Sequence, residues 1–203
     1  MLRKKFDIDL DNVDANGIAE SQNPSSGGDL TLNGALGTTL DFARRIGITS
    51  DADDLGRTFT ITGTDSDGKT LTEDVTGPNA GTSTSTEYFT TISSISIDAA
   101  SAGNITVGTV DEAKTKTYPL DRISDSGASI AVTVTGTIDF TVQETFDDVQ
   151  ADSQSALYID TSLADKTASI TGTASVGASA LQLVVNSYTD TAELQWQIAQ
   201  PRR

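Results

Sequence analysis

The stretch GRTFTITGTDSDGKTLTEDVTG, residues 56–77, decides the fold of the chain. Its apolar residues alternate with polar ones, mostly threonines, on both sides of a central turn: Phe59, Ile61, Leu71 and Val75. Alternation at every second residue is typical of β-strands that bury one face. The turn, Asp65-Ser66-Asp67-Gly68, offers polar side chains and a glycine for a position with positive φ. The stretch therefore predicts a β-hairpin.

Other parts of the chain repeat the alternation. Residues 130–134 and 138–142 flank the turn Gly136-Thr137 and predict a second, shorter hairpin. Residues 181–185 and 194–198 predict a final pair of strands.

Further strands are expected over residues 40–48, 88–97 and 104–110. In the second of these the alternation slips at Ser93-Ser94, which predicts a β-bulge. The charged segment from Asp111 to Lys116 has no apolar face and is expected to be a linker.

The composition agrees with an all-β chain. Hydrophobic residues make up 36% of the 203 residues, aromatic residues only 5%, and 31 residues are threonine. Threonine suits pleated, half-exposed sheets, and helical periodicity is almost absent. We therefore expect two β-sandwich units, immunoglobulin-like or jelly-roll-like, over residues 30–112 and 116–203. Residues 1–29, with few apolar side chains, are expected to form an extended N-terminal arm.

The charge is strongly acidic. The net charge is −16, from 13 basic and 29 acidic residues, and five of the basic residues lie at the two ends: Arg3, Lys4, Lys5, Arg202 and Arg203. The stretch between them holds 8 basic and 29 acidic residues, a balance of −21. Such a body repels phosphates, so direct binding of nucleic acid is not expected. The acidity has two interpretations: it keeps a β-rich protein in solution, or it receives basic ends within an assembly.

The arm is the candidate partner-binding segment. Its apolar residues Phe6, Ile8 and Leu10 alternate with aspartates, so the arm could add a strand to a neighbouring sheet. The basic residues Arg3, Lys4 and Lys5 precede them and favour an acidic partner. We expect the arm to lie on a different chain, and its deletion to leave both sandwiches folded. The alternative is a frayed tail without a partner.

Catalytic chemistry finds little support in the sequence. The chain has no histidine and no cysteine, which excludes the usual triads, zinc sites and disulfides. Aspartates at positions 51, 53, 54, 65 and 67 could offer oxygens to calcium, but tight turns use the same residues. Neither an enzymatic activity nor a cofactor is expected. Arg44-Arg45 is interpreted as a solvated pair.

Membrane association is not expected either. No window approaches the roughly 18 apolar residues of a membrane span. The N-terminal MLRKKFDIDLDN has no apolar run behind its charges, so it does not resemble a signal peptide. We expect a soluble chain that is made in the cytoplasm.

Residues 18–110 resemble a recurring pattern of tailed-bacteriophage virion proteins. In that pattern a hairpin of the form G-x-x-[FV]-x-[IV]-x-G-T-D-x-x-G is followed by T-E-x-[IV] and a threonine-rich strand, and here the hairpin spans Gly56 to Gly68. The second half is similar only loosely, through FTVQETFDD at residues 140–148 and Gln200.

The resemblance implies a non-enzymatic structural subunit of the particle. The favoured hypothesis is a capsid-associated cement or decoration protein, or a subunit of the head–tail neck, located in virions after synthesis in the host cytoplasm. Its partners would be the major capsid protein or neck and tail proteins, together with further copies in a homo-oligomer. Two other hypotheses stay open: a tail or fibre subunit that binds a receptor or glycan, and, less favoured, an enzyme acting on glycans.

Overall fold

The computed structural model describes residues 2–121, 127–189 and 192–200. The described residues form sixteen β-strands and no helix, so none of them lies in a helix that could cross a membrane. In the part of the chain that the structure describes both sheets are antiparallel, which confirms the expected all-β, sandwich-like class. The chain folds as two compact units: unit 1 contains residues 1–12 and 112–203, and unit 2 contains residues 13–111.

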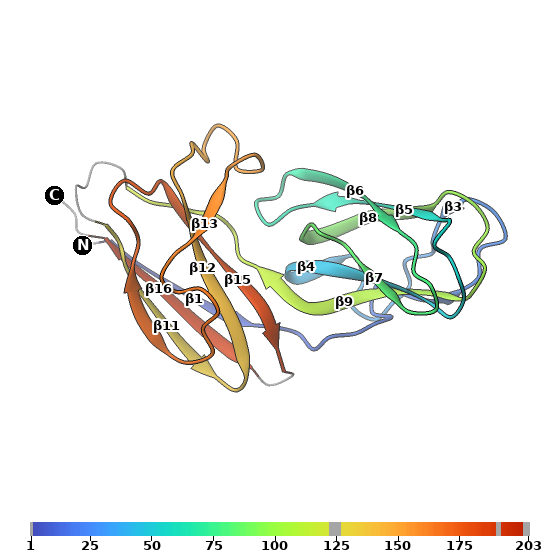
Figure 1. The fold of residues 1–203 in the computed structure, drawn as a ribbon, viewed down its shortest axis with the longest axis horizontal. Helices are drawn as coiled ribbons and strands as arrows, with labels where there is room; N and C mark the ends of the chain where they lie inside the picture. The colour runs from blue at the N-terminus through green and yellow to red at the C-terminus, as the bar shows by residue number, and fades with distance from the viewer. Residues whose placement is uncertain (1, 122–126, 190–191, 201–203) are drawn as a thin grey trace. The chain divides into compact units, whose positions relative to one another are not determined.

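Unit 2 is an antiparallel sheet wrapped around one core (Figure 1). Its strands are β2 (Ala19–Gln22), β3 (Gly28–Asp29), β4 (Thr39–Ser50), β5 (Thr58–Thr64), β6 (Thr70–Thr76), β7 (Thr82–Thr84), β8 (Phe89–Ile97) and the first part of β9 (Ile105–Lys114). The order β9-β4-β8-β5-β6 forms the main path, while β2 pairs with β9, β3 with β8 and β7 with β4.

The hairpin predicted from residues 56–77 is β5 and β6. Phe59 pairs with Val75 and Ile61 with Glu73, and Phe59 and Ile61 are fully buried in the core of unit 2. The Asp65 carboxylate accepts hydrogen bonds from the backbone N–H groups of residues 67 and 69, both at 2.9 Å. Gly68 has a φ of 80°, a conformation that favours glycine. Alternation and turn chemistry thus specify this element locally.

The predicted bulge lies in β8. The register against β5 shifts so that Thr62 pairs with Ser94 while Gly63 pairs with Ile92, which leaves Ser93 as the extra residue. The Ser93 hydroxyl donates to the carbonyl of Thr62 at 3.0 Å. Ile92 and Ile95 are three residues apart, so in a regular strand they would point to opposite faces. The extra residue of the bulge lets both side chains lie on the buried face.

Unit 1 is a sandwich of two antiparallel layers (Figure 1). Its strands are β1 (Leu2–Asp9), the end of β9, β10 (Tyr118–Pro119), β11 (Ser129–Thr135), β12 (Ile138–Thr145), β13 (Tyr158–Asp160), β14 (Ile170–Thr173), β15 (Ala180–Tyr188) and β16 (Glu193–Gln200). One layer has the order β1-β16-β11-β14. The other places β13, β12 and β15 side by side, with β10 and the end of β9 beyond β15.

The core of unit 1 lies between these layers. Trp196 and Ile198 of β16 and Phe140 and Val142 of β12 are buried to 2% exposure or less. Trp196 is the one tryptophan of the chain. The alternation of residues 194–198 was predicted, and Leu194, Trp196 and Ile198 are indeed the inward set.

Two predicted strand pairs are wrong in their partners. Strands β11 and β12, expected as a hairpin around Gly136, lie in different layers: β11 pairs with β14 and β16, and β12 with β13 and β15. Strands β15 and β16, expected as the final pair, are also in different layers. In each case the connection leads from one layer of the sandwich to the other.

The division of the chain also differs from the expected boundaries 1–29, 30–112 and 116–203. Residues 2–9 form β1, which pairs with β16 of the same chain over eight register pairs, and residues 13–29 belong to unit 2. The expected linker 111–116 begins inside β9, which continues to Lys114. Unit 1 is therefore discontinuous in sequence, and a deletion of residues 1–12 would remove one of its strands.

The expectation for Arg44 is corrected as well. Arg44 is 1% exposed, and its Nε and Nη2 atoms donate to the two carboxylate oxygens of Asp41 at 3.0 and 2.8 Å. Arg45 donates from Nε to the carbonyl of Ser85. A planar guanidinium can be buried when two of its N–H groups bind the two oxygens of one carboxylate, because the carboxylate then balances its charge and accepts its hydrogen bonds.

Candidate interaction surface

The apolar side of β1 belongs to the core of unit 1. Ile8 and Leu10 are buried, and Phe6 is half-buried. The Phe6 ring lies 5.2 Å from the ring of Trp196 and 5.5 Å from that of Tyr118, the latter edge to face. Burial raises the pKa of the Tyr118 phenol. The three apolar residues of the predicted binding segment thus close the sandwich of their own chain.

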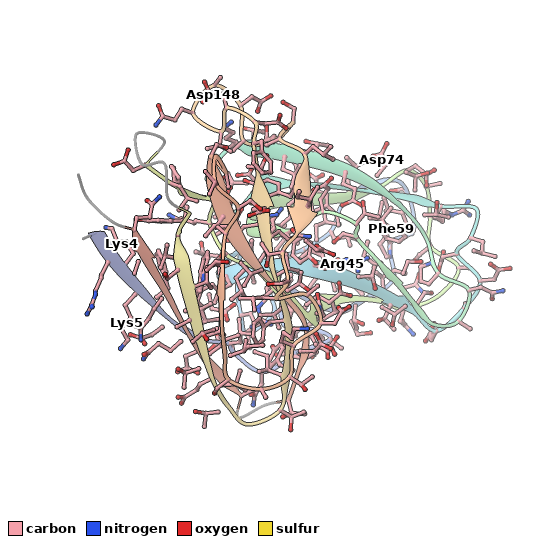
Figure 2. The ribbon with its side chains drawn as sticks, turned by 60° about the vertical axis from the view of Figure 1, so that its left-hand side comes forward. Lys4, Lys5, Arg45, Phe59, Asp74 and Asp148 are labelled. Carbon is pink, nitrogen blue, oxygen red and sulfur yellow. The ribbon has the colours of Figure 1, made fainter. Side chains whose placement is uncertain are left out.

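The basic residues of β1 lie at the surface. Arg3, Lys4 and Lys5 are exposed, and Figure 2 shows Lys4 and Lys5 on β1, well separated from Asp148. The Lys5 ammonium lies 3.2 Å from Asp7, and Gln195 donates to the same Asp7 oxygen at 2.9 Å. The hydrogen bond from Lys5, followed by that from Gln195, lowers the pKa of the Asp7 carboxyl.

The outer side of β1 is a sheet edge. Among the described residues β1 pairs with one strand, β16, and ends the order β1-β16-β11-β14. An edge strand presents backbone donors and acceptors that can receive another strand. The segment predicted to bind a partner therefore has a free strand edge and three exposed cations. Its apolar residues pack within unit 1 of the same chain and are not available to a partner.

A second surface, which the sequence analysis did not identify, lies at the opposite layer of unit 1. Four of the large hydrophobic side chains that are exposed in the structure belong to it: Phe146 (52%), Leu157 (74%), Ile159 (47%) and Val176 (65%). We call these four residues the β13 patch. Large apolar side chains that gather at the surface mark contact sites more often than single ones do.

Strand pairing brings the β13 patch together. Glu144 pairs with Ile159 and Thr145 with Tyr158, so Phe146 follows β12 where Leu157 precedes β13. Residues two apart on a strand share a face, which places Ile159 and Leu157 on one side. A Cβ atom added at Gly177 would lie 4.0 Å from the Phe146 ring, so the turn that carries Val176 approaches the same ring.

A buried carboxylate fixes this turn. The Glu144 side chain is 4% exposed and accepts hydrogen bonds from the backbone N–H of Ser175 at 2.8 Å and from its hydroxyl at 2.5 Å. These two contacts tie the turn beside Val176 to β12. The β13 patch is therefore built on a fixed framework.

Aspartates border the β13 patch. Asp147 and Asp148 follow Phe146 and are exposed, whereas Asp160, next to Ile159 in β13, lies on the opposite face of the strand. The Asp147 carboxylate accepts from the backbone N–H of Leu157 at 2.7 Å, and the Asp160 carboxylate accepts from Gln143 at 2.9 Å. The surface thus combines an apolar centre with an acidic rim.

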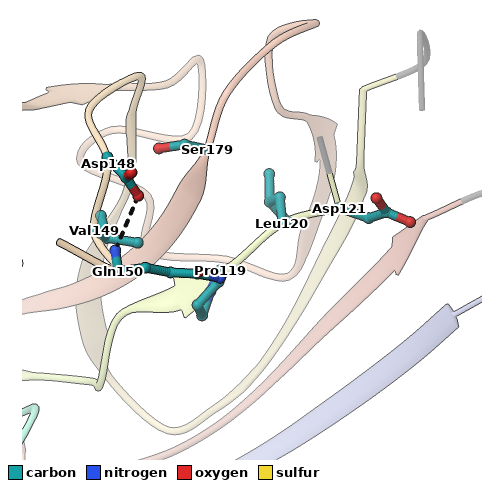
Figure 3. Close-up of a pocket in the computed structure, with 7 residues that line it drawn as sticks. All are labelled: Pro119, Leu120, Asp121, Asp148, Val149, Gln150 and Ser179. Carbon is teal, nitrogen blue, oxygen red and sulfur yellow. Dashed lines mark hydrogen bonds between the residues drawn. The ribbon is translucent and has the colours of Figure 1, made fainter. Parts of the chain in front are cut away.

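A pocket of about 370 Å³ lies next to this rim (Figure 3). Two of its walls carry carboxylates, Asp121 and Asp148, and Leu120, Val149 and Ser179 line it as well. The Asp148 carboxylate accepts a hydrogen bond from the backbone N–H of residue 150 at 3.2 Å. The pocket has an acidic and apolar lining, which suits a cationic group with an aliphatic stem better than an anion.

The aspartates considered as calcium ligands accept hydrogen bonds from the loops around them. Asp54 is buried, and its carboxylate accepts from the Ser50 hydroxyl at 2.6 Å and from the N–H of Ala102 at 2.7 Å. Hydrogen bonds from the side chain and backbone of Asn104 lower the pKa of the Asp51 carboxyl. In the described ranges no three acidic side chains come together as a metal site would require.

Sequence reasoning missed the β13 patch although part of its signal was present. Leu157 and Ile159 flank Tyr158 in the alternation of a short strand, and β13 spans Tyr158–Asp160. Alternation alone does not tell whether these two apolar side chains are covered or exposed. The pairing of β13 with the end of β12, together with the exposure of Leu157 and Ile159, shows that these side chains are not covered by the other layer of unit 1.

Comparisons of the chain with protein-family models, with curated proteins and with solved structures found no match.

Proposed function

We propose that the chain is a non-enzymatic structural subunit of a tailed-bacteriophage virion, a cement or decoration protein of the capsid or a subunit of the neck. In this role it binds the shell and neighbouring copies of itself. The observation that carries the proposal is the hairpin pattern at residues 56–68, through its resemblance to virion proteins.

The residues that the hairpin pattern specifies have structural roles in unit 2. This supports a resemblance in fold and not only in composition. Phe59 and Ile61 fill the core, Asp65 holds the turn and Gly68 takes positive φ. At Gly63, a Cβ atom would lie 1.9 Å from the carbonyl oxygen of residue 91, so only glycine fits at the bulge. The residues shared with the virion-protein pattern are therefore ones that the fold of unit 2 requires.

The surface of unit 1 supports an assembling subunit. The β13 patch exposes apolar side chains, and the edge of β1 carries three cations on a chain of net charge −16. Contact surfaces of both kinds suit a protein that is held among other proteins.

The proposal is tested on purified virions of a phage whose genome encodes this chain. Mass spectrometry is expected to find the chain in stoichiometric amounts, and electron cryo-microscopy to place its density on the head or neck. Absence of the chain from virions would overturn the proposal. Density at the tail tip would instead favour the receptor-binding hypothesis.

A functional measurement complements the localisation. Particles assembled without the chain are expected to release DNA at a lower temperature than complete particles, because a cement protein adds contacts between shell subunits. Addition of the purified chain should restore the release temperature. Unchanged release in both cases would exclude a cementing role.

A further inference from the structure

Two surfaces of unit 1 complement each other in charge. The β13 patch has an apolar centre and an acidic rim, whereas the edge of β1 carries Arg3, Lys4 and Lys5. Long basic side chains cover apolar surface with their aliphatic stems while their charged ends stay in water. Such side chains can lie across Leu157 and Phe146 and bring their cations to the aspartates around them.

One copy cannot join these two surfaces within itself. Phe6 of β1 contacts Tyr118 of β10, and the Tyr188 hydroxyl donates to the carbonyl of residue 11 at 2.5 Å, so β1 lies over the β10 side of β15. Strand β13 lies on the other side of β15, beyond β12. The two strands therefore occupy opposite edges of the sandwich.

We propose that the β13 patch is the docking site for the basic edge of β1 of a second copy of this chain. The contact is heterologous, since each copy uses one surface to receive and the other to insert. Repetition of such a contact closes a ring if the rotation permits and otherwise produces a filament. The inference deepens the proposed function, because it specifies how neighbouring copies would bind.

Charge argues against the alternative in which the β13 patch pairs with its own copy. A twofold contact would bring Asp147 and Asp148 of both copies together at one interface. Like charges at a desolvated interface oppose association. Residues 3–5 of β1 reverse that sign, and Lys4 and Lys5 are both exposed on the strand (Figure 2).

The test uses the purified full-length chain and sedimentation velocity over a range of protein concentration. The wild-type chain is expected to associate, and added salt is expected to weaken the association because the contact pairs exposed charges. Leu157→Ser should abolish it. The matched control is Leu55→Ser, which removes a leucine of unit 2 that is 55% exposed and should leave association unchanged.

The basic partner is tested by Lys4→Glu, with Lys116→Glu as a control of equal charge change at another exposed lysine. Lys4→Glu should give monomers and Lys116→Glu should not. A mixture of the Leu157→Ser and Lys4→Glu variants should form a one-to-one complex and stop there, since each variant keeps the surface that the other lacks. Thermal unfolding of every variant checks that it is folded.

Three outcomes would overturn the inference: a wild-type chain that remains monomeric, equal effects of Leu157→Ser and Leu55→Ser, and association that survives Lys4→Glu. The last would show that the patch binds something other than β1. Because the measurement needs only the purified chain, its failure is separate from the absence of the chain from virions.

Discussion

Replacement of Ile8 by alanine tests whether β1 is part of the sandwich of its own chain. Ile8 is 2% exposed and lies opposite Leu194 in the register of β1 and β16. The change removes three buried carbon groups, each about 0.8 kcal/mol. With a small cavity term at an edge strand that can relax, the expected loss in the free energy of unfolding is about 3 kcal/mol.

The single tryptophan makes the assay selective. Trp196 belongs to unit 1, and its ring lies against Phe6 of β1, so its fluorescence reports the unfolding of unit 1. Circular dichroism reports both units. A loss of about 3 kcal/mol is expected to lower the midpoint of the fluorescence transition by roughly 12–24 °C for a domain of this size.

The control is Ile61→Ala, which empties an equally buried position in the core of unit 2. It should lower a transition seen by circular dichroism and leave the fluorescence midpoint in place. A fluorescence midpoint that is unchanged in Ile8→Ala would refute the placement of β1. Equal fluorescence shifts in both variants would refute the independence of the two units.

Three further predictions concern single contacts. Asp54→Ala should destabilise unit 2 by about 2–4 kcal/mol in denaturant titrations, because it leaves the buried donors that this carboxylate binds without an acceptor; a loss below 0.5 kcal/mol would contradict this role. Gly63→Ala should prevent the bulge and lower the melting temperature of unit 2, and a neutral effect would show that the Ser93 bulge can shift. In Lys5→Ala the pKa of Asp7, measured by NMR titration, should rise toward its ordinary value. Because the pKa of Asp7 is depressed in the folded protein, its ionised carboxylate stabilises the protein above the unfolded pKa. This contribution is lost as the pH falls through the folded pKa. Lys5→Ala should therefore reduce the part of the acid-induced loss of stability that comes from Asp7.

The β5–β6 hairpin shows what the sequence alone can specify. Its strands, its turn and its buried face depend on residues within one short stretch, and Asp65 and Gly68 encode the turn by their own chemistry. The bulge at Ser93 is equally local, because a break in alternation must be absorbed inside the strand that contains it. Both features were predicted for this reason.

The pairing of strands in unit 1 could not be predicted in the same way. Alternation in residues 130–134 and 138–142 tells which side chains are buried, and this was correct for Ile130, Val132 and Phe140. It does not tell whether the next strand is a neighbour in the sheet or faces it across the core. A tight turn at Gly136, with a φ of 83°, serves either connection, and here the chain changes layer.

The N-terminal segment shows why an arm and a strand look alike in sequence. Phe6, Ile8 and Leu10 alternate as any edge strand does, but the partner of β1 lies about as far along the chain as it can, as the contact between Asp7 and Gln195 shows. Unit 2 is inserted between β1 and the rest of unit 1, so nothing near residues 2–9 in sequence indicates their partner. Because chains are made from the N-terminus, the pairing of β1 cannot form before β16 has been synthesised, whereas all of unit 2 is already available. Until then residues 2–9 are a strand whose partner in the sheet has not yet been made.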